Sequence, residues 1–258
     1  VSEWGVNGPF EAKKTSWKAK IEPPNGVKAD QRKRRYLQLI EKDKELCLGS
    51  YCFLWGQKQE STATWHGMFL SNGNPTEAVD VMQFCWTGDW PKSRAPSIKD
   101  ISLENIGWRK DHILAPSSQA TLKIDYQNYN NKKVIVNYVL YPEAFSNKIG
   151  GDIQKSPEPI EIEIVSQSDN VLTFVTPIEK GAYRLFAYVK NEKGQTCVFM
   201  SDGELQEGQI WEAAMYAGVN KLNNMCVILD NNKMQNETYT KQTLNVMPLI
   251  EKWKAFNW

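Results

Sequence analysis

The sequence predicts a mixed fold of helices and strands, arranged in three successive segments. Apolar runs typical of buried strands alternate with helical patterns over residues 1–95. Short stretches of alternating apolar and polar residues follow over residues 96–195, as expected for an antiparallel sheet. A strand, helix and strand pattern occupies residues 196–258. At 258 residues, the chain is long enough for two domains of ~100–200 residues each.

The first segment has the element order expected at the end of a (β/α)₈ barrel. Residues 1–3 read as the end of a strand, and the helical pattern of residues 27–44 follows a Pro-Pro-Asn-Gly turn. Residues 47–55 are dense in apolar side chains and predict a strand buried on both faces, and residues 77–86 predict another helix. In such barrels catalytic groups lie where the strands end, so Glu3 fits the placement of a catalytic carboxylate if residues 1–3 close a strand. A solvated N-terminal residue is the alternative.

The second segment predicts a β-sandwich. A proline-rich linker at residues 90–96 separates it from the first segment. Strands are expected where apolar and polar residues alternate between turn clusters, over residues 120–126, 133–140, 160–164, 171–175 and 183–189.

The third segment predicts two parallel strands joined by a helix. Residues 196–200 form an apolar strand that ends at Asp202-Gly203, residues 208–221 have helical spacing, and residues 225–229 form a second strand. Such a crossover is right-handed and makes the strands parallel. Asp202 and Asn232 therefore both leave the sheet at its carboxyl edge and face one site.

Asp202 and Asn232 offer hard oxygen ligands, which Mg²⁺ prefers together with substrate phosphate oxygens. The turn after the first strand also leaves backbone N–H groups free to receive a diphosphate. The pattern therefore predicts a site for Mg²⁺ and a diphosphate. The alternative is a generic parallel sheet in which Asp202 and Asn232 only cap turns.

The stretches SDGELQEGQIWEAAM, KLNN, LDNNKMQ and EKWKAFNW, within about residues 197–258, resemble the diphosphate-binding domain of transketolases. The resemblance implies thiamine diphosphate held through Mg²⁺, with Asp202, Gly203 and Asn232 at the cofactor. Asp202 and Asn232 would be side-chain ligands of the metal, and the backbone carbonyl of Met234 would be a third ligand. The family motif usually opens with Gly-Asp-Gly, whereas Ser201 stands first here.

The same resemblance places Glu207 and Glu212 towards a subunit interface and implies a sugar-phosphate substrate. Thiamine catalysis also needs a pyrimidine-binding domain whose glutamate activates the cofactor. The sequence contains no such domain, so a second subunit or domain would be required, and this part is expected to be inactive alone.

The stretches SEWG, SYCFLWGQKQ and GMFLSNGNPTEAVDVM, within residues 1–95, resemble the barrel end of glycoside hydrolases of the family 2 type. Residues 96–195 then resemble the immunoglobulin-like module that follows such barrels. The resemblance implies that Glu3 is the nucleophile and that Trp55 packs under a sugar ring. Retaining glycosidases need a second carboxylate as acid/base. That residue would lie on an earlier strand, so no hydrolysis is expected.

Composition narrows the remaining function classes. The net charge is +1 with dispersed Lys and Arg, which argues against nucleic acid, and no apolar run approaches the ~20 residues of a membrane span. Five cysteines without a Cys-x-x-Cys pair argue against a disulfide framework or zinc knuckle. The two histidines, His66 and His112, lack a second ligand at metal spacing, and His66 reads as a satisfied structural residue.

Neither resembled domain is complete, and the chain begins at Val1, so we expect a fragment or a fusion of two unrelated fragments, or an assembly error. Three hypotheses follow: a thiamine diphosphate-dependent transferase segment, the tail of a glycoside hydrolase, or a non-catalytic β-sandwich interaction module. The compartment stays open, cytoplasmic for the first and periplasmic or secreted for the second.

Overall fold

The computed structural model describes residues 3–43, 45–47, 49–145, 154–191, 196–222 and 225–258. The chain divides into a first unit, Val1–Lys193, and a second unit, Gly194–Trp258. Both combine strands with helices, so the fold is mixed α and β with several sheets. None of the helices in these ranges is long and apolar enough to span a membrane.

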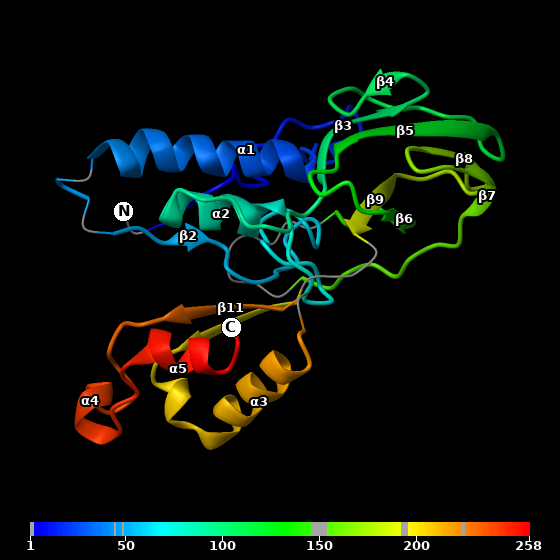
Figure 1. The fold of residues 1–258 in the computed structure, drawn as a ribbon. Helices are drawn as coiled ribbons and strands as arrows, with labels where there is room; N and C mark the ends of the chain where they lie inside the picture. Colours follow the sequence, from blue (N-terminus) through cyan, green and yellow to red (C-terminus); the bar gives the residue numbers. More distant parts are fainter. Residues whose placement is uncertain (1–2, 44, 48, 146–153, 192–195, 223–224) are drawn as a thin grey trace. The chain divides into compact units, whose positions relative to one another are not determined.

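The first half of the first unit consists of two packed helices beside a short parallel strand pair (Figure 1). Strand β1 (Trp4–Gly5) pairs in parallel with β2 (Cys52–Phe53). Helix α1 (Asn25–Arg35) continues into a π-helical turn (Tyr36–Ile40) and a 3₁₀ turn (Glu41–Asp43), which confirms the predicted helix within the described residues. Residue 44 lies outside them.

Helix α2 (Glu77–Thr87) confirms the helix predicted over residues 77–86. It begins at Thr76, whose hydroxyl accepts a hydrogen bond from the Ala78 N–H, and ends at Gly88 with a φ of 82°. A side-chain cap and a left-handed glycine are the usual start and stop of a helix. Ala29 of α1 and Val81 and Cys85 of α2 form the buried contact between the two helices.

The strand predicted over residues 47–55 is shorter and more exposed than expected. Among the described residues of this range, Cys52–Phe53 alone is a strand, and Tyr51 is 76% exposed, so burial on both faces was wrong. The parallel partner β1 offers only two residues for pairing, and apolar density alone did not reveal this limit. Residue 48 lies outside the described residues.

The second half of the first unit contains two antiparallel sheets that share one core. The larger sheet has the order β4-β3-β5-β8-β7 and the smaller one pairs β6 with β9. Leu122, Ile124 and Phe174 of the larger sheet pack with Val136 of the smaller sheet. Their bounds are β3 (Ser97–Leu103), β4 (Ile106–Gly107), β5 (Gln119–Gln127), β6 (Val134–Pro142), β7 (Glu163–Gln167), β8 (Val171–Val175) and β9 (Tyr183–Asn191).

Four of the five strands predicted in this segment are found close to their expected bounds. The exception is the strand expected over residues 160–164, because Glu163–Gln167 pairs with β8 and Ile160 makes only an isolated bridge to Leu140. All residues of β7 are exposed, so the sequence has no alternation of buried and exposed residues that would predict its pairing. The immunoglobulin-like identity of the two sheets stays a prediction.

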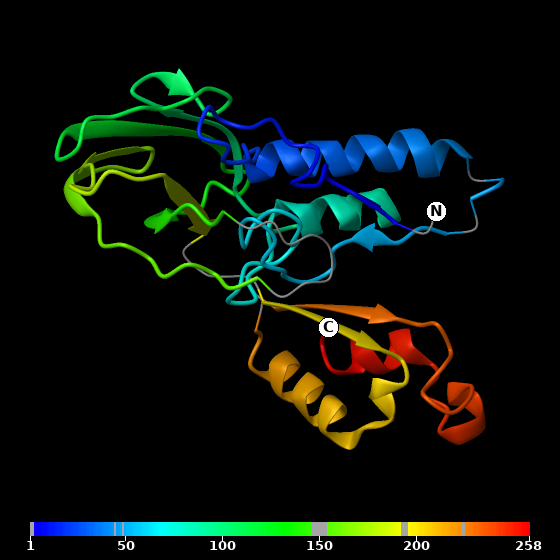
Figure 2. The same cartoon turned by 180° about the vertical axis from the view of Figure 1, so that it is seen from behind.

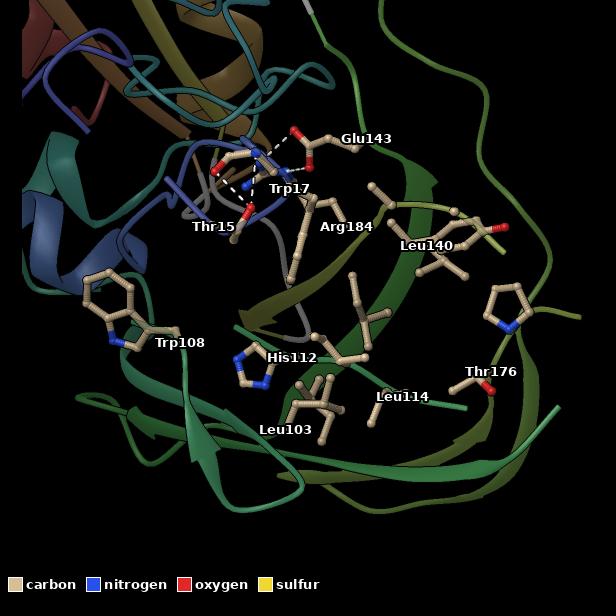
Figure 3. Close-up of a pocket in the computed structure, with 18 of the residues that line it drawn as sticks. Thr15, Trp17, Leu103, Trp108, His112, Leu114, Leu140, Glu143, Thr176 and Arg184 are labelled. Atoms are coloured by element: carbon tan, nitrogen blue, oxygen red, sulfur yellow. Dashed lines mark hydrogen bonds and ion pairs between the residues drawn. The ribbon is translucent and has the colours of Figure 1, made fainter. Parts of the chain in front are cut away.

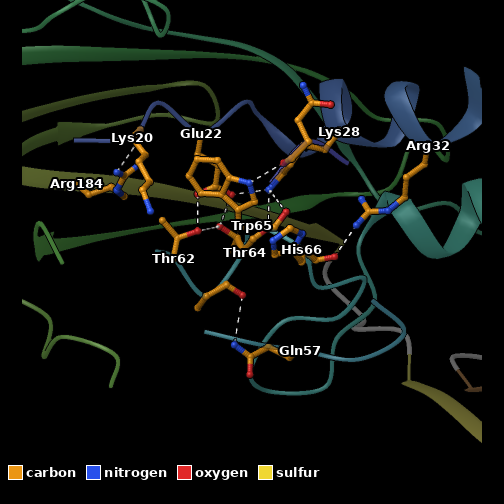
Figure 4. A network of polar contacts seen from close by, with 12 residues as sticks. Lys20, Glu22, Lys28, Arg32, Gln57, Thr62, Thr64, Trp65, His66 and Arg184 are labelled. Atoms are coloured by element: carbon orange, nitrogen blue, oxygen red, sulfur yellow. Dashed lines mark hydrogen bonds and ion pairs between the residues drawn. The ribbon is translucent and has the colours of Figure 1, made fainter. Parts of the chain in front are cut away.

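A buried polar network ties α1 to the loop before α2 (Figure 4). The Glu22 carboxylate accepts hydrogen bonds from Lys28 Nζ at 2.5 Å, from Thr62 Oγ1 at 2.6 Å and from Thr64 Oγ1 at 2.8 Å. Burial opposes the charge on Glu22, but Lys28 and Arg184 outweigh it and hold the pKa of Glu22 below its usual range. The carboxylate is therefore ionised and fully partnered.

The second unit is a strand, helix and strand pattern with helices on one face of its sheet. Strands β10 (Thr196–Ser201) and β11 (Met225–Asp230) are parallel, joined by a 3₁₀ turn (Glu204–Gln206) and α3 (Gly208–Val219), as predicted. Two further helices, α4 (Thr240–Thr243) and α5 (Leu249–Ala255), were not predicted. Figures 1 and 2 show α3 and α5 on the same side of the strands.

The core of the second unit lies between this sheet face and the two longer helices. Met200, Leu205, Val246 and Leu249 are buried there. At Gly218 a Cβ atom would overlap the Phe256 carbonyl oxygen, so glycine permits the close approach of α3 to the residues that follow α5. The α5 helix thus completes the core that strands and α3 begin.

Candidate functional site

The candidate site lies at the carboxyl edge of β10 and β11. The strands are paired in register from Thr196 with Met225 to Ser201 with Asp230, so both leave the sheet at the same level. The Asp202 N–H donates to the Asp230 carbonyl at 3.0 Å. The two turns predicted to share one edge therefore do so.

Asp202 is the buried acidic group at this edge, with 1% of its surface exposed. Its Oδ2 accepts a hydrogen bond from Thr240 Oγ1 at 3.1 Å. Its Oδ1 is buried and has no hydrogen-bond partner among the described residues. A buried polar atom normally has a partner, and an unpartnered carboxylate oxygen is the ligand type that Mg²⁺ takes. The observed carboxylate therefore fits the predicted metal ligand.

Gly203 brings the turn after β10 against the loop that follows β11. A Cβ atom at Gly203 would lie 2.9 Å from Gln235 Cβ and 3.1 Å from the Met234 carbonyl oxygen. The absence of a side chain lets the backbone of Met234 approach this closely. The structure thus brings together Gly203, which is expected at the cofactor, and the Met234 carbonyl, which is expected at the metal.

Asn232 is exposed and its amide is engaged within its own loop. Its Nδ2 donates to Asp230 Oδ2 at 3.0 Å, and its Oδ1 accepts from the Met234 N–H at 2.9 Å. A carbonyl oxygen has a second lone pair, so Oδ1 can still serve a cation. These two hydrogen bonds of Asn232 order the loop that carries Met234, and its role as a metal ligand stays a prediction.

Ser201 and Glu204 make reciprocal hydrogen bonds across the turn that follows β10. The Ser201 N–H donates to Glu204 Oε2 at 2.6 Å, and the Glu204 N–H donates to Ser201 Oγ at 3.3 Å. These bonds hold the turn that carries Asp202 and Gly203. The serine that departs from the usual glycine thus has a structural role here.

Thr240 and Gln206 were missed in the sequence. Gln206 Nε2 donates to the Thr240 carbonyl at 3.2 Å, to Thr243 Oγ1 at 2.7 Å and to the Leu244 carbonyl at 3.0 Å. This amide fixes the segment whose Thr240 hydroxyl holds Asp202. No local sequence pattern marked either residue, because their partners lie more than thirty positions away.

Glu207 and Glu212 are both exposed on the second unit. Glu207 precedes α3, and its side chain does not cap that helix. Exposed carboxylates are compatible with a subunit contact. Both stay predicted interface residues.

The two glycosidase-type residues lie in the first unit, and their roles also stay predictions. Glu3 is exposed and precedes β1, so it does not close the strand expected over residues 1–3, of which residues 1 and 2 lie outside the described range. Trp55 follows β2, and its ring contacts Phe69 at 5.2 Å and Trp86 at 5.7 Å between centroids.

His66, expected to be a satisfied structural histidine, is buried, but its Nδ1 has no hydrogen-bond partner in the described part of the chain. Its Nε2 lies 3.8 Å from Glu60 Oε1. Burial lowers the pKa of His66, and Glu60 only partly opposes this. Within the described residues, no three His, Cys, Asp or Glu side chains are grouped as a metal site.

Comparison with known proteins concerns the C-terminal part of the chain. Residues 187–258 match the family model described as "Transketolase, thiamine diphosphate binding domain". A 59-residue stretch is 49% identical to the 6-deoxy-6-sulfo-D-fructose transketolase subunit SqwG of Clostridium sp. (strain MSTE9), covering 23% of this chain and 22% of that protein. A 64-residue stretch is 47% identical to one of the subunits of apulose-4-phosphate transketolase of Actinobacillus succinogenes, covering 25% and 23%.

Transketolase of Rattus norvegicus is 29% identical over 80 residues, which cover 31% of this chain and 11% of that protein. The chain therefore spans less than a quarter of the length of the curated relatives it matches. The transketolase resemblance predicted for about residues 197–258 is confirmed at the level of the thiamine diphosphate-binding domain. The family match leaves residues 1–186 outside it, and the glycosidase resemblance gains no support from these matches.

Proposed function

We propose that the second unit is the diphosphate-binding part of a thiamine diphosphate-dependent transferase that moves ketol groups between sugar phosphates. The observation that carries this proposal is the buried Asp202 carboxylate at the carboxyl edge of a parallel strand pair. One oxygen of this carboxylate is held by Thr240, and the other has no hydrogen-bond partner among the described residues. The Met234 carbonyl approaches the same turn.

In this proposal three oxygens of the chain hold Mg²⁺: Asp202 Oδ1, Asn232 Oδ1 and the Met234 carbonyl. These are hard ligands of the kind that Mg²⁺ combines with phosphate oxygens in an octahedral shell. Thiamine diphosphate, when bound, supplies the carbanion chemistry of ketol transfer. The residues of this unit contribute binding and orientation of the diphosphate end, which Thr240 supports by fixing the Asp202 carboxylate.

A partner subunit is part of the proposal. Two of the relatives are named as transketolase subunits, and this chain spans a small part of their length. The activating glutamate and the sugar-phosphate site would then come from a second subunit or domain. Exposed Glu207 and Glu212 are the residues we assign to that contact.

Calorimetric titration of the intact chain with thiamine diphosphate, with and without Mg²⁺, tests the site. We expect binding that requires Mg²⁺, that is lost in Asp202→Ala and that is retained in Glu251→Ala, which removes an exposed carboxylate elsewhere in the same unit. Absence of binding to the intact chain would overturn the proposal. Equal binding by the Asp202→Ala variant would do the same.

The parallel pairing of β1 with β2 does not support the glycosidase hypothesis. Neighbouring parallel strands are what a barrel requires, but two strands of two residues each do not distinguish a barrel from other folds. Our expectation is that the chain does not hydrolyse aryl β-glycosides. Release of nitrophenol that is abolished in Glu3→Gln would show this expectation to be wrong.

A further inference from the structure

A cavity of about 700 Å³ lies in the first unit, between its two antiparallel sheets and residues 15–22 (Figure 3). Its volume falls within the ~300–1,000 Å³ that is usual for small-molecule sites. All residues that line the cavity belong to the first unit.

The wall of the cavity is mainly apolar and continues into the core of the two sheets. Leu122 and Phe174 line it and also belong to the buried cluster, while Leu103, Leu114 and Leu185 pack against that cluster. Each Å² of apolar ligand surface that is buried here would contribute ~25 cal/mol of favourable free energy. The wall therefore favours the hydrocarbon or ring portion of a ligand.

A hairpin of residues 13–21 forms one side of the cavity and is held by hydrogen bonds at both ends. Within it the Thr15 N–H donates to the Ala19 carbonyl at 2.9 Å. Arg184 Nη2 donates to the Lys20 carbonyl at 2.8 Å, and the Ser16 N–H donates to Asp111 Oδ2 at 3.1 Å. Hydrogen bonds of the chain itself thus hold this side of the cavity in place.

Arg184 is itself fixed, because its Nε and Nη2 donate to the two oxygens of Glu143 at 3.1 and 2.7 Å. A two-point guanidinium and carboxylate contact of this kind is geometrically specific. Figure 3 shows this pair at the hairpin side of the cavity. The Arg184 and Glu143 pair holds the hairpin side of the cavity, and its two opposite charges cancel.

The remaining charges that line the cavity are mostly positive. Lys20, Lys110 and Lys180 line it and have no ion-pair partner among the described residues. Of the lining carboxylates, Glu22 is paired with Lys28 and Glu143 with Arg184, which leaves Glu179 against three lysines. The surplus of positive charge favours an anionic group at the rim of an apolar cavity.

The geometry points to a binding site for a small amphiphile that has an apolar body and one anionic group, of which a medium-chain carboxylate is the simplest representative. The apolar body would occupy the space beside Leu103, Leu114 and Leu122. The anionic group would lie near the unpaired lysines. Neither feature depends on the function proposed for the second unit.

Calorimetry of the intact chain with dodecanoate tests this site, with dodecyltrimethylammonium as a probe of the same chain length and opposite charge. We expect one dodecanoate per chain, and about tenfold weaker binding of the cation, corresponding to ~1.4 kcal/mol. Absence of dodecanoate binding, or equal binding of the two amphiphiles, would overturn the assignment.

Variants locate the binding. The pair Lys110→Gln/Lys180→Gln should weaken dodecanoate binding by about fivefold, because each exposed charge contributes modestly. The pair Lys42→Gln/Lys155→Gln, also exposed and of equal charge change, should leave it unaltered. Ala182→Trp, which places a large ring in the lining, should abolish binding while circular dichroism stays native. If that variant does not fold, the lysine pairs decide, since equal binding by both pairs contradicts the proposal.

Discussion

The Thr240 hydroxyl donates a hydrogen bond of 3.1 Å to Asp202 Oδ2, joining the start of α4 to the turn after β10. Both side chains are buried, at 5% and 1% exposure, so water does not compete for this bond. The contact fixes one carboxylate oxygen and leaves the other, Oδ1, without a hydrogen-bond partner in the described residues. Thr240 is therefore a positioning residue for the proposed metal ligand.

Replacing Thr240 by valine removes this hydrogen bond with little change in shape. We expect a loss of about 1 kcal/mol in the stability of the second unit, as for an ordinary buried hydrogen bond whose acceptor loses its partner. Mg²⁺-dependent binding of thiamine diphosphate should weaken, while Thr240→Ser should retain most of it. Calorimetric affinity with each variant is the measurement. Thr238→Val, in the same loop but bonded to Gln242, is the control and should bind like the parent chain.

Gly203→Ala tests the close approach of the Met234 backbone. A Cβ at 2.9 Å from Gln235 Cβ and 3.1 Å from the Met234 carbonyl oxygen forces the loop after β11 to move. The backbone of Gly203 is right-handed, with a φ of −64°, so the effect comes from this contact and not from backbone strain.

We expect Gly203→Ala to weaken thiamine diphosphate binding several-fold with only a small change in thermal stability. Gly208→Ala is the matched control, because a Cβ there meets nothing within 4 Å. Equal affinities of the two alanine variants would contradict a role for the contact between Gly203 and Met234.

Gly218→Ala should separate α3 from the end of the chain. Alanine at an open helical site stabilises by about 1 kcal/mol relative to glycine, but here its Cβ would overlap the Phe256 carbonyl oxygen. We expect residues 253–258 to detach, with loss of the hydrogen bond from Trp258 Nε1 to the Ala214 carbonyl. Hydrogen exchange measured by mass spectrometry should be faster in residues 253–258 of this variant. The control Val219→Ala, at a 74% exposed position, should leave the exchange rate of these residues unchanged.

The Glu22 network predicts a specific pH dependence of the first unit. Because the pKa of Glu22 is lower in the folded state than its ordinary 4.5, ionised Glu22 stabilises the fold above about pH 4.5. This contribution is lost as the pH falls through the lowered pKa.

Glu22→Gln leaves Lys28 buried without its counter-charge, which costs about 3–5 kcal/mol at neutral pH. The difference in stability between parent and variant should narrow steadily below pH 4.5. Denaturant unfolding at several pH values measures this difference. Glu158→Gln, an exposed substitution, should lie within about 0.5 kcal/mol of the parent throughout. A gap that stays constant with pH would show that Glu22 is not the group responsible.

Strands β10 and β11 and helix α3 of the second unit were predictable because their signals are local and continuous, whereas α4 and α5 were not predicted. The apolar runs of β10 and β11 and the spacing of α3 fix a crossover whose handedness and parallel pairing follow from general rules. Asp202 could be placed at the carboxyl edge for the same reason. Thr240 could not, because its hydroxyl finds Asp202 only through the fold of a loop that carries no periodic pattern.

The strand errors in the first unit also arise because the sequence pattern does not show which segments pair. The apolar run before Trp55 predicted a long buried strand. Strand length is set by the partner, however, and within the described residues β1 pairs with Cys52 and Phe53 alone. The five residues of β7 are exposed on a sheet edge, where no buried alternation records the pairing. Sequence patterns report burial, whereas pairing partners are fixed by topology.

The in-register pairing of β10 with β11 separates the carboxyl ends of the two strands from their amino ends, and we expect insertions to be tolerated differently at the two ends. Asp202 and the loop of Asn232 leave from one edge, whereas the connection from α3 into Met225 returns to the other. Insertions in that returning connection would leave the ligand edge intact, since six residue pairs of the two strands lie between them.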